Sequence, residues 1–149
     1  MEETDEIKIP EEVIAASDLK KKKRKRSLAQ LPVYRDVVNL KLIFVQLTKD
    51  SPNSLRKFFD LDLSNISEVQ KSIGFAKLSL DCRRYEDAIW YMNSSLVIVQ
   101  EIRDDFTILK QLGIVDADTY NKAKALMKGV VAQLKAWRDY DNSEGANSH

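Results

Sequence analysis

The segment from residue 116 to residue 140 constrains the fold most, because its apolar residues recur with the period of an α-helix. At about 100° per residue, one side of this helix collects Tyr120, Ala123, Met127, Val130, Leu134 and Trp137. The adjoining side collects the cations Lys124, Lys128, Lys135 and Arg138. The apolar side requires partner helices, whereas the basic side requires solvent or an anion.

Three earlier stretches repeat apolar residues at the same spacing, and each predicts an amphipathic helix. The first stripe consists of Val33, Val37, Leu40, Phe44 and Leu47. The second consists of Phe59, Leu63, Ile66, Val69, Ile73, Ala76 and Leu80. The third consists of Ile89, Met92, Leu96, Val99, Ile102, Phe106 and Leu109.

Turn signals separate these predicted helices. The first begins at Pro32 and ends near residues 48–50, because the residue before Pro52 avoids the α region. The second runs to about residues 81–84, and the weak helix formers at 62–65 allow a kink near Ser64. The third runs from about Tyr85 to Gly113, a residue suited to the left-handed conformation after a helix. Asp116 or Asp118 then caps the fourth.

These elements predict an all-α domain. Short links between long helices favour antiparallel neighbours, so we expect an up-down-up-down four-helix bundle over residues 31–140 and a polar, frayed tail at 141–149. A chain of 149 residues indicates one domain. Only four glycines and three prolines are present, which argues against an all-β fold with its frequent turns.

Residues 1–30 are predicted to form a disordered arm, because their charges occur in blocks without a sustained apolar period. Residues 1–19 have a net charge of −6 and the next seven residues a net charge of +7, whereas the net charge of the bundle is only +2. The basic run would bind a phosphate backbone, an acidic protein surface or a nuclear-import receptor, or it is a solvated linker. It consists of Lys20, Lys21, Lys22, Lys23, Arg24, Lys25 and Arg26.

The sequence contains no arrangement typical of catalysis. His149, the only histidine, lies in the tail, so histidine-based acid–base chemistry and histidine-bearing zinc sites have no support. Cys82, the only cysteine, has no histidine in the bundle to activate it, and we interpret it as a partly buried thiol near a helix end. We predict no catalytic residue, no metal and no cofactor. The lack of a signal-peptide pattern predicts a cytoplasmic protein, and no apolar run predicts a membrane helix.

Two surfaces are candidates for binding. No acidic residue occurs between positions 119 and 138, so the basic side of the last helix is either an anion site or a solvated face favoured by the helix dipole. The third helix has an apolar face wider than one bundle core needs, which predicts a subunit contact through Trp90, Tyr91, Val97 and Ile98. Stacking of bases on Trp90, Tyr91 or Trp137 is the alternative use of these aromatics.

The order of several short motifs resembles a known family. These motifs are Leu31-Pro32-Val33-Tyr34, Leu47-Thr48-Lys49-Asp50-Ser51-Pro52, Leu112-Gly113-Ile114 followed by Tyr120, and Leu134-Lys135-Ala136-Trp137. Residues 31–138 thereby resemble the accessory variability determinant proteins of diversity-generating retroelements, which are related to the bundle proteins labelled S23 in ribosomal RNA intervening sequences.

The resemblance implies a ring-shaped homopentamer that is not an enzyme. It implies binding to a retroelement reverse transcriptase and to its template RNA or the cDNA, in support of mutagenic reverse transcription. The members of that family tend to be strongly basic, whereas this bundle carries a charge of only +2. An oligomeric scaffold that binds protein but no nucleic acid is therefore the alternative.

Overall fold

The computed structural model describes residues 27–148, and these residues form four long helices without a strand. They are α3 (Pro32–Asp50), α4 (Asn53–Asp81), α5 (Tyr85–Gln111) and α6 (Ala117–Ser148), preceded by the short 3-10 helix η1 (Leu28–Gln30). The predicted all-α four-helix bundle is confirmed. The predictions for residues 1–26 and for His149 lie outside the described residues.

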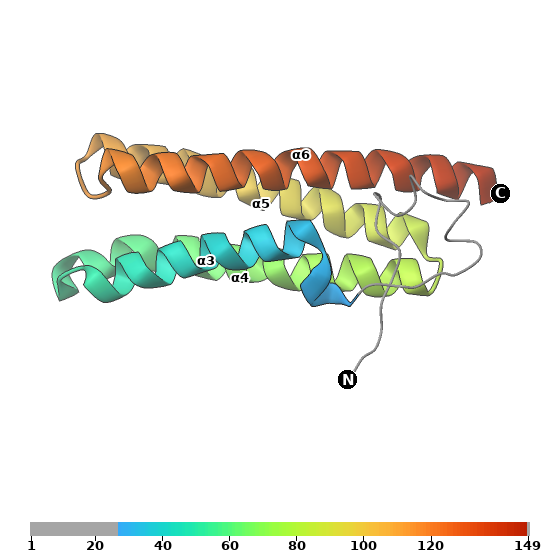
Figure 1. Ribbon diagram of the computed structural model, residues 1–149, viewed down its shortest axis with the longest axis horizontal. Coiled ribbons are helices and arrows are strands. Elements are labelled where there is room, and N and C mark those ends of the chain that lie inside the picture. Colours follow the sequence, from blue (N-terminus) through green and yellow to red (C-terminus); the bar gives the residue numbers. More distant parts are fainter. Residues whose placement is uncertain (1–26, 149) are drawn as a thin grey trace.

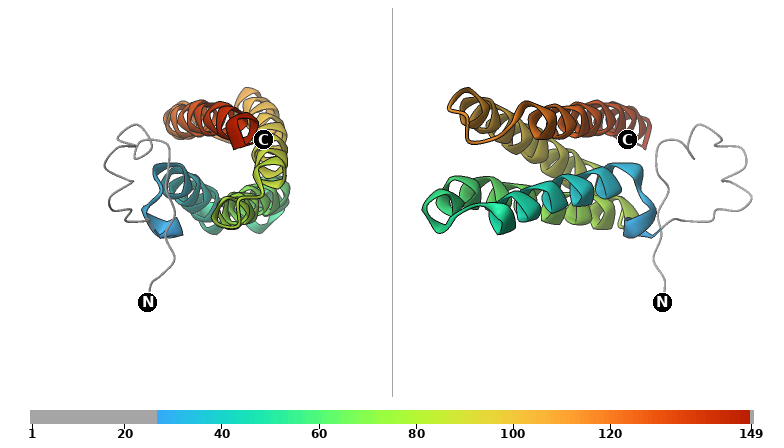
Figure 2. Two further views of the ribbon diagram at one scale, coloured as in Figure 1. Left: turned by 90° about the vertical axis from the view of Figure 1, so that its right-hand side faces the viewer. Right: turned by 60° about the vertical axis from the view of Figure 1, so that its left-hand side comes forward.

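The helices surround one core. α4 contacts α3 and α5, and α6 contacts α5 and α3, so each helix has two neighbours. Figure 1 shows the chain turning back at every short connection, an arrangement compatible with the predicted up-down-up-down order. The end-on view in Figure 2 shows the helices arranged around one shared centre, with α4 next to α5 as well as to α3. None of the helices within residues 27–148 is long and apolar enough to cross a membrane.

The predicted apolar stripes supply the core. Each stripe points inward from its helix, and the rings of Phe44 and Phe106 meet at 5.2 Å between centroids. Trp137 is buried, as its position on the apolar side of the last helix predicts. The fully buried large residues include Leu40, Phe44, Phe59, Ile66, Ile73, Met92, Ile102, Phe106 and Met127.

The turn after α5 has the geometry that Gly113 predicts. Its φ is +77°, its N–H donates to the carbonyl of Lys110 at 3.0 Å, and the N–H of Ile114 donates to the carbonyl of Leu109 at 2.9 Å. This pair of bonds is a Schellman motif. Asp116 then caps α6, because its Oδ1 accepts a hydrogen bond from the Thr119 N–H at 2.8 Å.

The turn between α4 and α5 uses the same motif without a glycine. Arg83 has a φ of +58°, and the N–H of Arg84 donates to the carbonyl of Ser79 at 2.8 Å. Cys82 precedes this turn and is exposed, so the prediction of a partly buried thiol is wrong. Cys82 follows Asp81, the last residue of α4, and its side chain lies in the exposed turn rather than on the buried face of the helix.

α4 continues through Ser64 without the break that the sequence allows there, because burial of its inner face outweighs the weak helix propensity of residues 62–65. The prediction for the apolar stripe of the third helix is wrong at two positions. In α5, the small residues Ala88 and Ser95 face the interior, while their larger neighbours Ile89 and Leu96 are only partly buried. The stripe is therefore shifted by one residue at these two positions.

Both ends of the bundle extend beyond the predicted limits. α6 continues to Ser148, past the expected end near residue 140, and Asp141 on this extension is buried. At the other end, Leu31 is buried and Leu28 of η1 packs against the core. The last four residues of the arm predicted for residues 1–30 therefore belong to the folded domain, which begins at residue 27 rather than 31.

Candidate nucleic-acid interface

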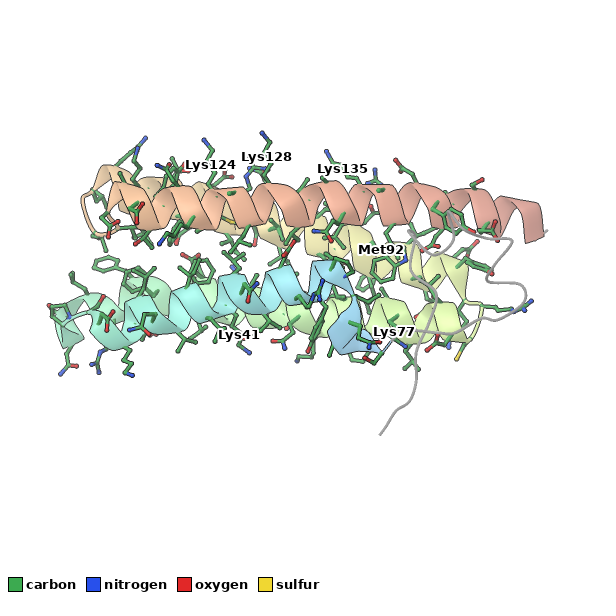
Figure 3. All side chains as sticks on the ribbon, in the orientation of Figure 1. Lys41, Lys77, Met92, Lys124, Lys128 and Lys135 are labelled. Carbon is green, nitrogen blue, oxygen red and sulfur yellow. The ribbon has the colours of Figure 1, made fainter. Side chains whose placement is uncertain are left out.

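The basic side of α6 forms an exposed row of lysines. Lys124, Lys128 and Lys135 all project from the same side of the helix, away from α3 and α4 (Figure 3). At 1.5 Å per residue, the row extends over about 16 Å along the helix axis. We call Lys124, Lys128, Lys135 and Arg138 the α6 basic stripe.

The three lysines of this stripe have no acidic partner within residues 27–148. The two carboxylates nearest to them along α6 are engaged with other cations: Asp118 pairs with Lys122 at 3.5 Å, and Asp139 pairs with Arg138 at 3.2 Å. An anion that approached the row would therefore meet ammonium groups whose charge no neighbouring side chain neutralises.

Arg138 differs from the lysines because it is held in place. Its side chain is only 28% exposed, and its Nη1 donates a hydrogen bond to Oδ1 of Asn93 on α5 at 3.1 Å. Its Nε donates to Asp139 at 3.2 Å. Of the four residues predicted for this surface, Arg138 therefore also joins α6 to α5.

A fifth cation joins the stripe from α5. The Nζ of Lys110 lies 5.0 Å from the centroid of the Tyr120 ring, and the Nζ of Lys124 lies 5.8 Å from it. Tyr120 stacks on Phe106 at 6.1 Å, and its hydroxyl hydrogen-bonds with Thr107 at 3.1 Å. The ring therefore holds two cations close together across two helices. The sequence does not predict that Lys110 joins this surface, because Lys110 lies on α5 and helical periodicity relates it only to other residues of α5.

The residues predicted for an oligomer interface divide into two groups. Trp90 is 63% exposed and Val97 is 61% exposed, whereas Tyr91 and Ile98 are partly buried against the core. The ring of Tyr91 contacts Trp90 at 5.2 Å and Phe75 of α4 at 5.3 Å. We call Phe75, Trp90 and Tyr91 the aromatic patch. Phase along a single helix gives no sign of Phe75, because it joins the patch from the neighbouring helix.

Two buried carboxyl groups have raised pKa values. Burial raises the pKa of Asp62 to about 8, and a hydrogen bond and charge from Asp105 add to the effect. Neither oxygen of Asp62 meets an N–H or hydroxyl donor within the described chain, so its bond to Asp105 requires that one carboxyl keeps its proton. Burial, together with the charge of Glu144, raises the pKa of Asp141 to about 7. Both aspartates are buried from solvent.

The remaining site predictions can be placed briefly. The basic run from Lys20 to Arg26 lies outside the described residues. Within residues 27–148, no three histidine, cysteine, aspartate or glutamate side chains come close enough together to hold a metal ion. Comparisons with protein-family models, with curated proteins and with solved structures give no match to this chain.

Proposed function

We propose that this protein is a non-enzymatic accessory subunit of a diversity-generating retroelement, acting in the cytoplasm. It binds the template RNA or the cDNA together with the reverse transcriptase, and it supports mutagenic reverse transcription. The order of the motifs between Leu31 and Trp137 supports the family, and the α6 basic stripe supports the nucleic-acid contact. The homopentamer that the resemblance implies is part of this proposal.

The row of lysines on α6, which have no acidic partner within residues 27–148, carries the proposal. Phosphates that lie along α6 would contact Lys124, Lys128 and Lys135, with Lys110 at one end of the row. Each contact releases counterions from the strand, so binding is independent of sequence and sensitive to salt. The basic run at Lys20–Arg26 would add contacts outside the bundle. Sequence-independent binding suits a subunit that must hold a template while another protein copies it.

Titration of the full chain with a fluorescent single-stranded RNA at several salt concentrations tests the proposal. We expect Lys124→Gln, Lys128→Gln and Lys135→Gln in one variant to weaken binding and to lower the slope of log affinity against log salt by about 2. The helical content should stay the same, because all three lysines are exposed.

The matched control removes three exposed cations elsewhere. Lys49→Gln, Arg56→Gln and Lys57→Gln lower the net charge equally, but they lie on α3 and α4. If both variants lose the same affinity, binding follows net charge alone and the α6 basic stripe is not the site. If neither variant loses affinity, the bundle makes no contact with RNA.

The aromatic patch favours the second candidate function, an oligomeric scaffold that binds protein but no nucleic acid. Trp90 of this patch and Val97, which also lies on α5, expose large apolar side chains, as is typical of a protein contact. The scaffold predicts no RNA affinity at any salt concentration, together with self-association through α5. The RNA titration therefore separates the two functions, and sedimentation of the protein alone tests the self-association that both of them predict.

A further inference from the structure

An open groove of about 540 Å³ lies where η1 and α3 meet α4. Its apolar part consists of Leu28, Gly74, Phe75 and Leu78, and its rim carries Lys41 and Lys71. The side chain of Phe75 is 45% exposed and that of Leu78 is 59% exposed. We call this the α4 groove. It is separate from the α6 basic stripe and shares only Phe75 with the aromatic patch.

Gly74 keeps the groove open. A Cβ atom at this position would lie 3.6 Å from Cδ2 of Leu28, which is ordinary van der Waals contact. The backbone of α4 therefore has room for a side chain there, and a large one would occupy the groove. A glycine in the interior of a long helix lowers stability relative to alanine. The packing of the bundle does not require a glycine at this position.

The cations of the rim have little acidic compensation. Lys41 donates from Nζ to the neutral Oε1 of Gln70 at 3.0 Å, and Gln70 donates in turn to the hydroxyl of Tyr34 at 2.8 Å. Lys71 lies 3.8 Å from Glu68 in an exposed pair, which contributes little. An occupant with apolar side chains and carboxylates would match the groove in both shape and charge.

The chain itself contains a segment of this composition. Residues 6–19 hold four carboxylates against one lysine, and they include Ile7, Ile9, Val13, Ile14 and Leu19. We propose that residues 6–19 dock in the α4 groove of their own chain, with their isoleucines and valine on Phe75 and Leu78 and their carboxylates beside Lys41 and Lys71.

The connection between the segment and the groove is long enough. Eight residues lie between Leu19 and Leu28, and the nine residue steps at about 3.3 Å each reach about 30 Å. The part of α4 that lines the groove, from residue 67 to residue 78, covers about 16 Å at 1.5 Å per residue. Because Leu28 itself lines the groove, residues 6–19 reach any part of it in the same molecule.

The single cysteine provides the test. Cys82 is exposed and lies one helical turn beyond Leu78, so a nitroxide attached to it broadens the amide signals of any segment docked in the groove. With the full chain labelled with ¹⁵N, we expect the amides of residues 6–19 to lose signal selectively, and to recover it when the nitroxide is reduced. A nitroxide at Leu112→Cys in a Cys82→Ser background, at the exposed connection between α5 and α6, should leave these amides unchanged.

Two variants test the contacts themselves. The first variant replaces four apolar residues of the arm by serine: Ile7, Ile9, Val13 and Ile14. It should abolish the broadening, and the helical content should stay constant because the four residues lie outside the described bundle. Gly74→Leu fills the groove from the other side and should have the same effect. Equal signals with the oxidised and the reduced nitroxide would overturn the proposal. Broadening between a spin-labelled chain and a separate ¹⁵N-labelled chain would also overturn it, because the arm would then bind a second copy.

Discussion

Arg83 is the only non-glycine residue with a positive φ in the described part of the chain, at +58°. An L-residue with a side chain loses about 1–2 kcal/mol of stability in the left-handed region. Glycine removes this loss, but its larger conformational entropy in the unfolded state offsets part of the gain. We therefore expect Arg83→Gly to raise the free energy of unfolding by about 0.5–1 kcal/mol, measured by urea denaturation. Gly113→Ala, at a φ of +77°, is the matched opposite and should destabilise. A neutral or destabilising Arg83→Gly would contradict this.

Asp62 predicts how the stability of the bundle depends on pH. Its pKa rises from 3.8 to about 8 on folding, first through burial and then through Asp105. Because the folded-state pKa is the higher one, the stability that protonated Asp62 contributes is complete below about pH 4 and is lost as the pH rises to about 8. The wild-type bundle should therefore be less stable at pH 9 than at pH 5.

Asp62→Asn removes this dependence, because asparagine stays neutral and still donates a hydrogen bond to Asp105. We expect the stability of the variant relative to wild type to increase by at least about 2 kcal/mol between pH 5 and pH 9, measured by urea denaturation. Asp141, whose pKa is raised to about 7, is unchanged in both proteins and therefore cancels in the comparison. A constant difference across this pH range would show that Asp62 is not protonated in the folded protein.

At the scale of the helix, α6 contains a glycine that its packing does not require. A Cβ at Gly129 would lie 3.7 Å from Oδ2 of Asp36 and 3.9 Å from Nε2 of Gln133, both at ordinary contact distance. The hydrogen bond between these two side chains, 2.7 Å long, is undisturbed. We expect Gly129→Ala to raise the free energy of unfolding by about 0.5–1 kcal/mol, seen as a higher urea midpoint. A lower midpoint would mean that α3 and α6 approach too closely for a methyl group.

The positions of the four helices could be predicted from the sequence because apolar periodicity and turn residues agree at every boundary but the last. Gly113 and Asp116 are examples in which one residue type suits one backbone position. The continuity of α4 could not be predicted, since the propensity of residues 62–65 opposes it and tertiary burial decides the outcome. The extension of α6 past residue 140 could not be predicted either, because the polar sequence there contains no apolar repeat.

The candidate site was predictable only where it lies on one helix. Lys124, Lys128 and Lys135 share a helical phase, so their common face follows from the sequence alone, and Figure 3 shows them together. Lys110 and Phe75 belong to surfaces built from two helices, and the register between helices decides which residues meet there. Single-helix periodicity contains no information about that register.

At the scale of the whole molecule, charge and apolar surface are distributed over different helices. The bundle carries only +2, yet the α6 basic stripe concentrates cations on one side of one helix, and the aromatic patch lies between α4 and α5. A nucleic acid on α6 would therefore leave Trp90 and Val97 free for protein contact. The two surfaces can be changed independently, so RNA affinity and self-association can be measured separately.

Self-association through α5 is the prediction for the assembled protein. Trp90 and Val97 are each more than 60% exposed, and burying them between subunits would stabilise the oligomer by about 25 cal/mol for each Å² of apolar area removed from water. We expect the full chain to sediment as an oligomer, and Trp90→Ser with Val97→Ser to shift it toward the monomer without loss of helical content. Leu112→Ser removes an equally exposed apolar side chain beyond the end of α5 and should leave the mass unchanged. A wild-type chain that sediments as a monomer at high concentration would exclude α5 as a subunit contact, and the aromatic patch would then be available only to a different protein.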